Sequence, residues 1–488
     1  MRTLQLGVFL FALWLPVTAL EADSGRDLRL IDAVKNADAG AIRALLKQGV
    51  DVNARNGDGT SALHWAVYRG DREATGLLIQ AGAAVNAATD LGITPLWMAC
   101  TGGSTVLIAR LLEAGADPNI APRTNGTPLM VAARTGNVDA VKLLLDHHAN
   151  VNAREAARDQ SALMWAVSER HPDVVRELLD AGANVHARSK TSSRYVLLCC
   201  QDFQSDSEGG TYTQEGGFTP LLFAAREGDS ESATRLLAAG ANIEDAAPTG
   251  TSALVLAAHS DRGVFATFLL EKGANADADG AGYTALHAAA IRGDRSLVKA
   301  LLSHGANPNA RQTRGSPARR YSGIALDKTM IGATPFLLAT RSSQLEIMKL
   351  LAASGADVNS FLVDGTTPVM AAARRQGREG RGLAENRIVE AMRLAIELGS
   401  KLDAVDSSGD TALHIAAVRR LDTVVQFLVK AGAPINAANN QGQSPLAATL
   451  APLPPAKGSG EATFNEYNAL ANRTKGTVEL LRKLGATE

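Results

Sequence analysis

The chain has 488 residues, which is enough for several ordinary domains or for one extended array. Hydrophobic residues make up 46% and aromatic residues only 4%, so the composition speaks against disorder and favours a core of closely packed small residues. The 49 basic and 50 acidic residues nearly balance, which excludes a bulk electrostatic attraction to nucleic acid or to a membrane surface.

The N-terminus predicts a secretory signal peptide over residues 1–22. Arg2 precedes an apolar run over residues 4–15, and small residues follow up to Ala19. The run is shorter than the about 20 apolar residues of a membrane span. Cleavage after Ala19 or Ala22 would leave a protein that is secreted or periplasmic and has no transmembrane span. An uncleaved anchor and a packed N-terminal helix are the alternatives.

A tripeptide of Ser or Thr, then Pro or Ala, then an apolar residue recurs along the rest of the chain. Most spacings between copies are 32 to 34 residues, and three longer spacings and an interrupted last unit mark four insertions. A fixed period of this length predicts an array of stacked units. The copies begin at Ser61, Thr94, Thr127, Ser161, Thr219, Ser252, Thr284, Thr334, Thr367, Thr411 and Ser444.

Each unit predicts two short helices and a polar turn. The Ser or Thr can cap a helix, and Pro is tolerated at the first helical position. Glycines such as Gly136 can close the first helix in the left-handed conformation. The second helix carries apolar residues on one face, as Val298 and Leu301 do, and an Asn-rich turn follows. One such pair cannot bury its apolar face alone, so the units must be stable collectively.

The segments "TALHAAAIRGD", "TPLMVAARTGN" and "TALHIAAVRR" resemble the repeats of ankyrin-repeat proteins. The resemblance implies an all-α repeat solenoid, an ankyrin-type stack of helix-turn-helix units with short β-hairpin connections, over residues 24–488 with about 12 units. It also implies that His64, His287 and His414 tie neighbouring turns together by hydrogen bonds. We expect caps at residues 28–59 and 443–488, and insertions near residues 187–217, 311–331, 375–387 and 451–472.

The insertions allow two interpretations. A solenoid tolerates extra length in its loops because the stack continues beneath them. Long loops are also where such scaffolds acquire specific contacts. The insertions near residues 311–331 and 375–387 are rich in arginine, so each could meet an anionic partner.

The resemblance further implies that the two positions before the glycine of the first helix face a concave groove. Seven of the ten complete units carry arginine there, which helix-end electrostatics alone could explain. The alternative is a basic ladder that binds an acidic partner by forked hydrogen bonds. The candidate partner-binding residues are Tyr68, Arg69, Arg134, Arg226, Arg292, Arg341, Arg374, Arg375 and Arg419.

No catalytic or metal-binding motif stands out. The pair Ser296 and Lys299 has the spacing of some acyl enzymes but lies in an ordinary second helix without companion motifs. Cys100 replaces an alanine of the repeat and is expected to be buried filler. Cys199 and Cys200 are either apolar filler or a strained vicinal disulfide. We expect no catalytic residues, no metal and no cofactor.

The sequence therefore predicts a non-catalytic scaffold that binds a partner protein through its concave face and inserted loops, with an acidic protein as one candidate partner. The protein is expected to be monomeric, to act outside the cytoplasm and to bind no nucleic acid. One alternative is attachment to an anionic surface polymer or glycan through the arginine ladder and the basic insertions. A second alternative is an enzyme whose site lies in the first insertion.

Overall fold

The computed structural model describes residues 27–123, 126–197, 210–314, 316–317, 326–374, 381–450 and 473–487. The predicted signal peptide and the Cys199–Cys200 pair lie outside these residues, as do parts of all four predicted insertions. The chain divides into two compact units, Met1–Pro122 (unit 1) and Arg123–Glu488 (unit 2). Among the helices of the described ranges, none has the length and apolar character required to span a bilayer.

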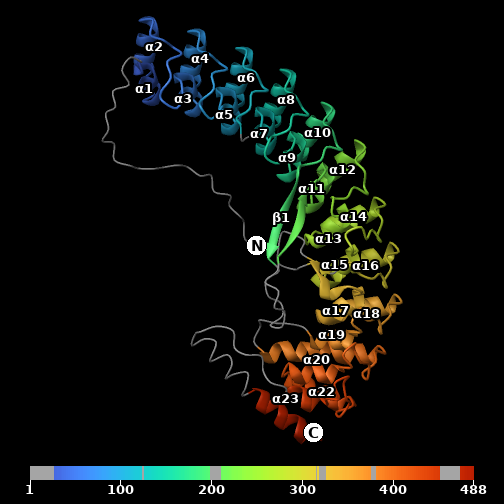
Figure 1. Cartoon of the computed structure of the whole chain (residues 1–488). Helices are drawn as coiled ribbons and strands as arrows, with labels where there is room; N and C mark the ends of the chain where they lie inside the picture. The colour runs from blue at the N-terminus through green and yellow to red at the C-terminus, as the bar shows by residue number, and fades with distance from the viewer. Residues whose placement is uncertain are drawn as a thin grey trace. The chain divides into compact units, whose positions relative to one another are not determined.

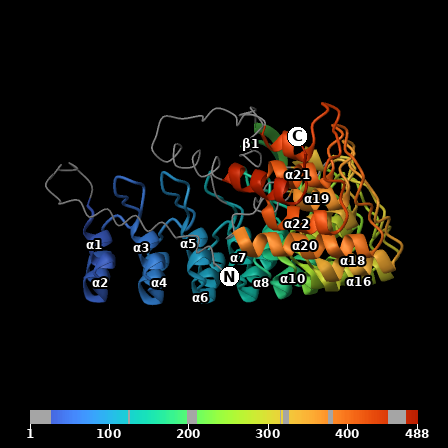
Figure 2. The same ribbon diagram turned by 90° about the horizontal axis from the view of Figure 1, so that it is seen from below.

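Unit 1 is a row of helix pairs in which each first helix lies beside its second helix, with the connecting loops on the side of the first helices (Figure 2). Its helices are α1 (Arg29–Lys35), α2 (Ala39–Lys47), α3 (Ala62–Tyr68), α4 (Arg72–Gln80), α5 (Pro95–Gly102) and α6 (Thr105–Glu113).

Unit 2 continues the same pairing and adds two small two-stranded sheets. In Figure 1 its first helices, from α9 to α17, lie on the inner side of the stack and its second helices, from α10 to α18, on the outer side. Its elements are α7 (Pro128–Thr135), α8 (Val138–Asp146), α9 (Ala162–Ser168), α10 (Pro172–Asp180), β1 (Thr191–Leu197), β2 (Gly210–Gly216), α11 (Pro220–Glu227), α12 (Ser230–Ala238), α13 (Ala253–His259), α14 (Gly263–Glu271), α15 (Ala285–Arg292), α16 (Arg295–Ser303), β3 (Ser316–Pro317), β4 (Leu326–Asp327), η1 (Lys328–Met330), α17 (Pro335–Arg341), α18 (Leu345–Ala353), α19 (Pro368–Ala373), α20 (Arg381–Glu397), α21 (Ala412–Val418), α22 (Asp422–Lys430) and α23 (Pro445–Leu450). Residues 473–483 form a further helix.

The helix ends follow the chemistry that the repeat predicts. In α5 the hydroxyl of Thr94 accepts a hydrogen bond from the N–H of Trp97 at 3.2 Å, and Pro95 occupies the first helical position. Gly103 then closes the helix with φ of 68°. Four second helices, α2, α4, α12 and α16, begin after an Asp whose carboxylate accepts from a backbone N–H, as Asp294 does from Leu297 at 2.9 Å.

Four repeats of unit 2 close the first helix without glycine. Arg170, Asp261, Ser343 and Arg420 hold the left-handed conformation there, with φ between 52° and 62°. A side chain in this conformation costs about 1–2 kcal/mol. The tertiary fold therefore imposes the same turn even where the residue does not favour it.

The core of unit 2 lies between neighbouring repeats rather than within each one. First helices pack against the next first helices, as α13 does against α11 and α15, and second helices pack in their own row. Leu254 and Ala257 of α13 are 2% and 0% exposed. A buried leucine contributes about 1.5–3 kcal/mol. Neighbouring repeats therefore cover both faces of an inner repeat. This stacked arrangement of helix pairs confirms the all-α repeat solenoid predicted from the sequence.

The prediction that the repeat histidines join neighbouring turns is also confirmed. His64, His287 and His414 are each fully buried, and each ring Nδ1 lies within hydrogen-bond distance of the Ser or Thr that starts its repeat. The opposite ring nitrogen of each faces a carbonyl of the next turn. The Nε2–O distances are 3.0 Å to Ile93, 3.0 Å to Ala310, 3.1 Å to Ala333 and 3.0 Å to Gln443.

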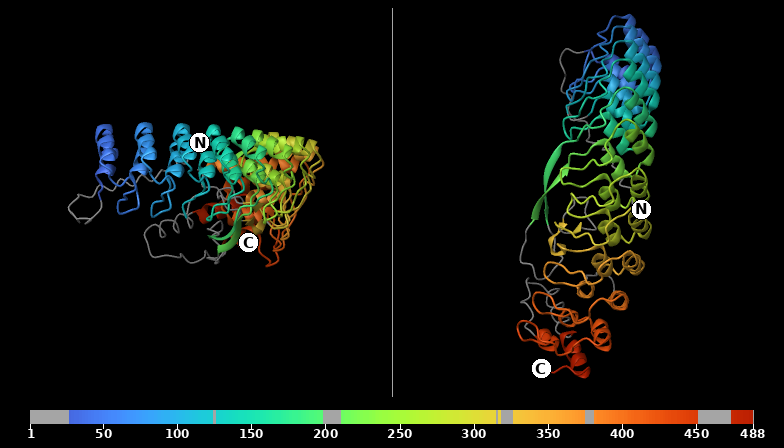
Figure 3. Two further views of the ribbon diagram at one scale, coloured as in Figure 1. Left: turned by 90° about the horizontal axis from the view of Figure 1, so that it is seen from above. Right: turned by 90° about the vertical axis from the view of Figure 1, so that its right-hand side faces the viewer.

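Three of the predicted insertions carry described structure at their ends. The first extends into the antiparallel hairpin β1–β2, and the second contains the short pair β3–β4. In the third, α20 already begins at Arg381, so residues 381–387 lengthen a second helix to 17 residues. The β1–β2 hairpin stands away from the helices on the side of the loops (Figure 3).

Candidate functional site

The predicted partner-binding residues share one position in the repeat. Each described member lies within the last two residues of a first helix or directly after it, where the helix carbonyls are left without intrahelical partners. We call these residues the first-helix face. Tyr68 and Arg69 belong to unit 1, and Arg134, Arg226, Arg292, Arg341, Arg374 and Arg419 belong to unit 2. Arg375 lies outside the described residues.

Two of these arginines bind the end of the preceding first helix. The guanidinium of Arg69 donates to the carbonyl of Lys35 at 2.9 Å, and that of Arg419 donates to the carbonyl of Arg374 at 2.9 Å. A cation at a helix C-terminus also interacts favourably with the helix dipole, by about 0.3–1 kcal/mol. These two contacts are the kind that helix-end electrostatics favours, and they link successive repeats.

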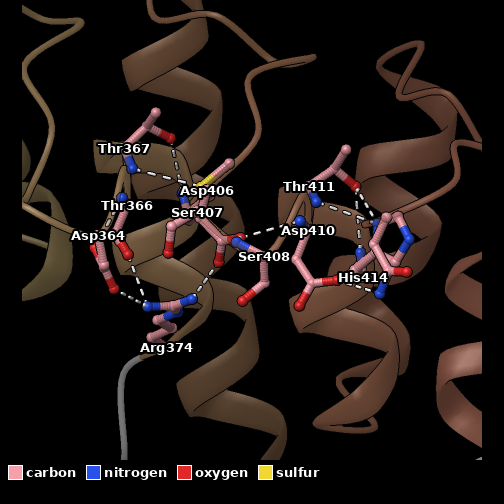
Figure 4. A network of polar contacts seen from close by, with 12 residues as sticks. Asp364, Thr366, Thr367, Arg374, Asp406, Ser407, Ser408, Asp410, Thr411 and His414 are labelled. Carbon is pink, nitrogen blue, oxygen red and sulfur yellow. Dashed lines mark hydrogen bonds and ion pairs between the residues drawn. The ribbon is translucent and has the colours of Figure 1, made fainter. Parts of the chain in front are cut away.

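Arg374 is engaged further, in the polar network of Figure 4. Its guanidinium contacts Asp364 Oδ2 at 2.9 Å and the hydroxyl of Thr366 at 2.7 Å. It also contacts Asp406 Oδ2 at 2.5 Å, on the next hairpin. Asp406 is buried, and its other oxygen accepts from the N–H groups of Ser408 and Asp410 at 2.9 and 3.0 Å. Arg374 therefore joins two hairpins and offers little to a partner.

The pKa of Asp364 reflects this network. Partial burial acts to raise the pKa of the carboxyl, but hydrogen bonds from Thr366 and Arg374 and the charge of Arg374 outweigh it and hold the pKa below its usual value. The carboxylate of Asp364 is therefore ionised throughout the neutral range.

Arg134 and Arg226 remain exposed and lie over aromatic rings. The guanidinium carbon of Arg134 is 5.2 Å from the ring centre of Trp165 in the next repeat, and that of Arg226 is 5.0 Å from the ring centre of Phe223. Arg226 also pairs with Glu227 at 2.8 Å. Such stacking restrains a guanidinium without using all of its hydrogen-bond donors. In unit 1, Tyr68 is 64% exposed, so it too can be reached from solvent.

The repeat of α13 departs from the arginine pattern in a way that sequence reasoning missed. His259 stands where neighbouring repeats carry arginine, and it is 9% exposed. Burial, together with the smaller effect of the charge of Arg292, lowers the pKa of His259 to about 4. Within the described structure, neither His259 Nδ1 nor the hydroxyl of the buried Tyr283 has a hydrogen-bond partner. The sequence did hold one signal for this departure, which is a histidine at a repeat position where other units carry arginine.

The described residues contain no group of three or more His, Cys, Asp or Glu side chains arranged to hold a metal ion. Ser296 and Lys299 lie in α16, an ordinary second helix. Cys100 is buried, and burial raises the pKa of its thiol to about 12, which keeps it in the unreactive thiol form.

The fold and the face define a repeat solenoid whose exposed helix ends and hairpins are available for contact. The family model of ankyrin repeats in three copies matches residues 30–122, 103–189 and 221–312, and the single-repeat model matches residues 331–361 and 408–440. These matches cover more than half of the sequence, and the chain belongs to the ankyrin-repeat family. Ankyrin repeats form protein–protein interaction scaffolds and are typically non-enzymatic modules.

Individual relatives match only part of the chain. It is 37% identical over 115 residues to an ankyrin repeat-containing protein of Treponema pallidum, which is 23% of this chain and 39% of that protein. It is 37% identical over 230 residues to human ankyrin repeat and SOCS box protein 16, which is 45% of this chain and 40% of that protein. The chain thus spans about two fifths of the length of these relatives.

Among solved structures, the ankyrin repeat domain of human ASB11 is similar at 29% identity with a TM-score of 0.38. The match covers 47% of this chain and 90% of that chain.

Proposed function

We propose that this protein is a non-catalytic scaffold that acts outside the cytoplasm and binds a partner protein through the first-helix face and the inserted loops. The observation that carries the proposal is the pair Arg134 and Arg226. Both are exposed, and both are restrained over aromatic rings in unit 2. A restrained guanidinium loses less conformational entropy when it binds a carboxylate, so an acidic protein surface is the partner of choice.

The location rests on the N-terminal sequence, in which a basic residue, a short apolar run and small residues follow one another. Expression of the full chain with its N-terminus intact, followed by mass spectrometry of the purified protein, tests it. The expected product begins after Ala19 or Ala22 and is found outside the cytoplasm. An uncut chain in the cytoplasm would contradict this part of the proposal.

The binding face is tested once a partner has been isolated by crosslinking. Replacing three arginines of unit 2 by alanine should weaken binding at least about tenfold, because charged contacts at an interface contribute about 1–3 kcal/mol each. The free energy of unfolding should change little, because exposed charged contacts contribute at most about 1 kcal/mol each. The three residues are Arg134, Arg226 and Arg292.

A matched control removes the same charge from the second helices of unit 2. Binding by this control should equal that of the unaltered protein, because its residues lie on α10, α12 and α16 in the other row. Equal weakening by both variants would show that net charge alone matters, and unaltered binding by the first would reduce the arginines to helix-end electrostatics. The control residues are Arg176, Arg235 and Arg295.

A further inference from the structure

Some second helices of unit 2 are capped by a side chain and others are not. Before α8 and α12 stand Asn137 and Asp229, whose side chains accept from a backbone N–H of the first turn at 3.0 and 3.1 Å. Before α10 and α14 the corresponding residues are His171 and Arg262, and neither side chain caps its helix. Both helices thereby lack the stabilisation that a capping side chain gives.

His171 and Arg262 instead reach across to the repeat before them. His171 Nε2 donates to the carbonyl of Arg134 at 3.0 Å, and Arg262 Nε donates to the carbonyl of Arg226 at 3.2 Å. Each side chain lies on the glycine that closes that first helix. A Cβ atom on Gly228 would stand 2.8 Å from Arg262 Cδ, so the absence of a Cβ lets this side chain lie close to the helix end.

The result at the end of α11 is a pair of neighbouring arginines. Arg262 contacts the backbone of Arg226, and both side chains are exposed. Arg226 belongs to the first-helix face, whereas Arg262 directly precedes a second helix and lies outside the repeat positions from which the binding residues were predicted. We call Arg226 and Arg262 the arginine pair.

Each guanidinium of the arginine pair is held through Nε. Arg226 Nε donates to Glu227 Oε1 at 2.8 Å, and the guanidinium carbon lies 5.0 Å from the ring centre of Phe223. Arg262 Nε is engaged by the carbonyl of Arg226. Within the described residues, no hydrogen-bond partner contacts Nη1 or Nη2 of either group. These two terminal nitrogens form a fork that can bind a carboxylate by two parallel hydrogen bonds.

The chain leaves the arginine pair with an excess of positive charge. Both residues lie at the C-terminus of α11, where helix carbonyls attract cations. Arg262 also stands before the N-terminus of α14, where a cation is unfavourable and where the first turn holds no acidic residue. Among the described residues, one carboxylate, that of Glu227, pairs with the two guanidinium groups. A ligand that brings further carboxylates would therefore complement this site.

We propose that the arginine pair binds two carboxylates of an acidic segment of the partner protein, one on each guanidinium fork. This inference rests on the proposed function, and it adds Arg262 to the residues that contact the partner. Because both forks are already held through Nε, they lose less conformational entropy on binding than free side chains would. A single carboxylate fills one fork, so the segment carries two acidic residues close together in its sequence.

The protein itself supplies the matched substitution for a test. Gln344 holds the position of Arg262 in the repeat of α18, and its side-chain nitrogen lies 2.7 Å from where a Cβ on Gly293 would stand. Arg262→Gln therefore keeps a side chain that fits over the closing glycine, and it removes the fork and the charge. Arg262→Lys keeps the charge and removes the fork. Arg295→Gln removes an exposed charge from α16 and serves as the control.

The test uses the full chain labelled with ¹⁵N and a synthetic peptide as the probe. The peptide Gly-Glu-Glu-Gly, blocked at both ends, offers two carboxylates, and its Gln-Gln counterpart offers none. Titration should shift the side-chain Nε–H signals of Arg226 and Arg262 with one shared dissociation constant. Arg262→Gln should weaken binding at least about fivefold, and Arg262→Lys should weaken it less. The Gln-Gln peptide should shift neither signal, and Arg295→Gln should bind like the unaltered protein. Equal melting temperatures of the three variants verify that the fold persists.

The inference is wrong if the Arg262 signal stays unshifted at about 1 mM peptide, or if Arg262→Gln binds as tightly as the unaltered protein. Equal weakening by Arg295→Gln would reduce the effect to net charge and would also contradict it. A heparin tetrasaccharide that binds the arginine pair more tightly than the peptide would identify an anionic glycan as the ligand, against the proposal.

Failure of this inference is distinguishable from failure of the proposed function. Shifts at Arg134 and Arg226 without a shift at Arg262 would reject the arginine pair and leave the first-helix face in place. Peptide binding at the arginine pair, combined with partner binding that survives the triple alanine variant, would reject the proposed face instead.

Discussion

The buried histidine of the α15 repeat ties the stability of unit 2 to pH. Thr284 donates its N–H to His287 Nδ1 at 3.1 Å, and Nε2 faces the carbonyls of Ala310 and Ala333. The ring is therefore neutral, with its proton on Nε2. Burial lowers the pKa of His287 to about 4 from the ordinary 6.5, although the two carbonyl bonds oppose the shift.

The magnitude follows from that difference. Between about pH 4 and 6.5 the unfolded chain binds a proton that the folded chain does not, so the free energy of unfolding rises with pH in this window. The contribution is complete above about pH 6.5 and is lost as the pH falls toward the folded value. A difference of about 2.5 pKa units corresponds to roughly 3 kcal/mol, of which roughly 2.5 kcal/mol is lost between about pH 7.5 and 4.5.

Urea unfolding of three proteins at these two pH values, followed by NMR signals from α15, measures the effect. His287→Gln should start less stable at neutral pH because it loses the ring contacts, but its decrease on acidification should be smaller than that of the unaltered protein by roughly 2.5 kcal/mol. Leu301→Ala leaves the titration unchanged and should lose about 2–5 kcal/mol at both values. A His287→Gln protein with the same acid sensitivity as the unaltered one would refute the reasoning.

Two further predictions concern the turns and the polar network. Arg170→Gly and Asp261→Gly should each stabilise the protein by about 1 kcal/mol, because both residues hold φ of 62°; calorimetry that shows no rise in melting temperature for either would argue against strain at these turns. Asp406→Asn should destabilise unit 2 by about 1–3 kcal/mol, because the guanidinium of Arg374 loses its buried partner while the turn bonds survive. A double-mutant cycle with Arg374→Met should show coupling, and purely additive losses would contradict the network.

Much of the fold could be predicted from the sequence because the repeat carries it locally. The capping hydroxyl of Thr94, the proline after it and the closing Gly103 act within a few residues of one another, so their pattern is visible in the chain. The role of His64 was implied by the resemblance to ankyrin repeats, and the structure shows both its contact with Ser61 in the same turn and its contact with Ile93 in the next.

The candidate site was harder to predict from the sequence than the fold. The sequence pattern treated all arginines of the first-helix face alike, but the structure shows that their surroundings differ. Arg374 is held between Asp364 and Asp406, and Asp406 lies 32 residues after Arg374 in the chain. Arg134, by contrast, lies over Trp165 and stays exposed. The residues next to each arginine in the sequence do not reveal its surroundings, because these depend on side chains of the next repeat.

The amino-acid sequence by itself determined the period, the two helices of each unit and the family to which the chain belongs, because these follow from residues a few positions apart. Only the tertiary structure decided which guanidinium groups are already bound and that, among the described residues, His259 Nδ1 and the Tyr283 hydroxyl are buried without hydrogen-bond partners. Those features arise at contacts between neighbouring repeats, and residues of both repeats contribute to the free energy of each contact.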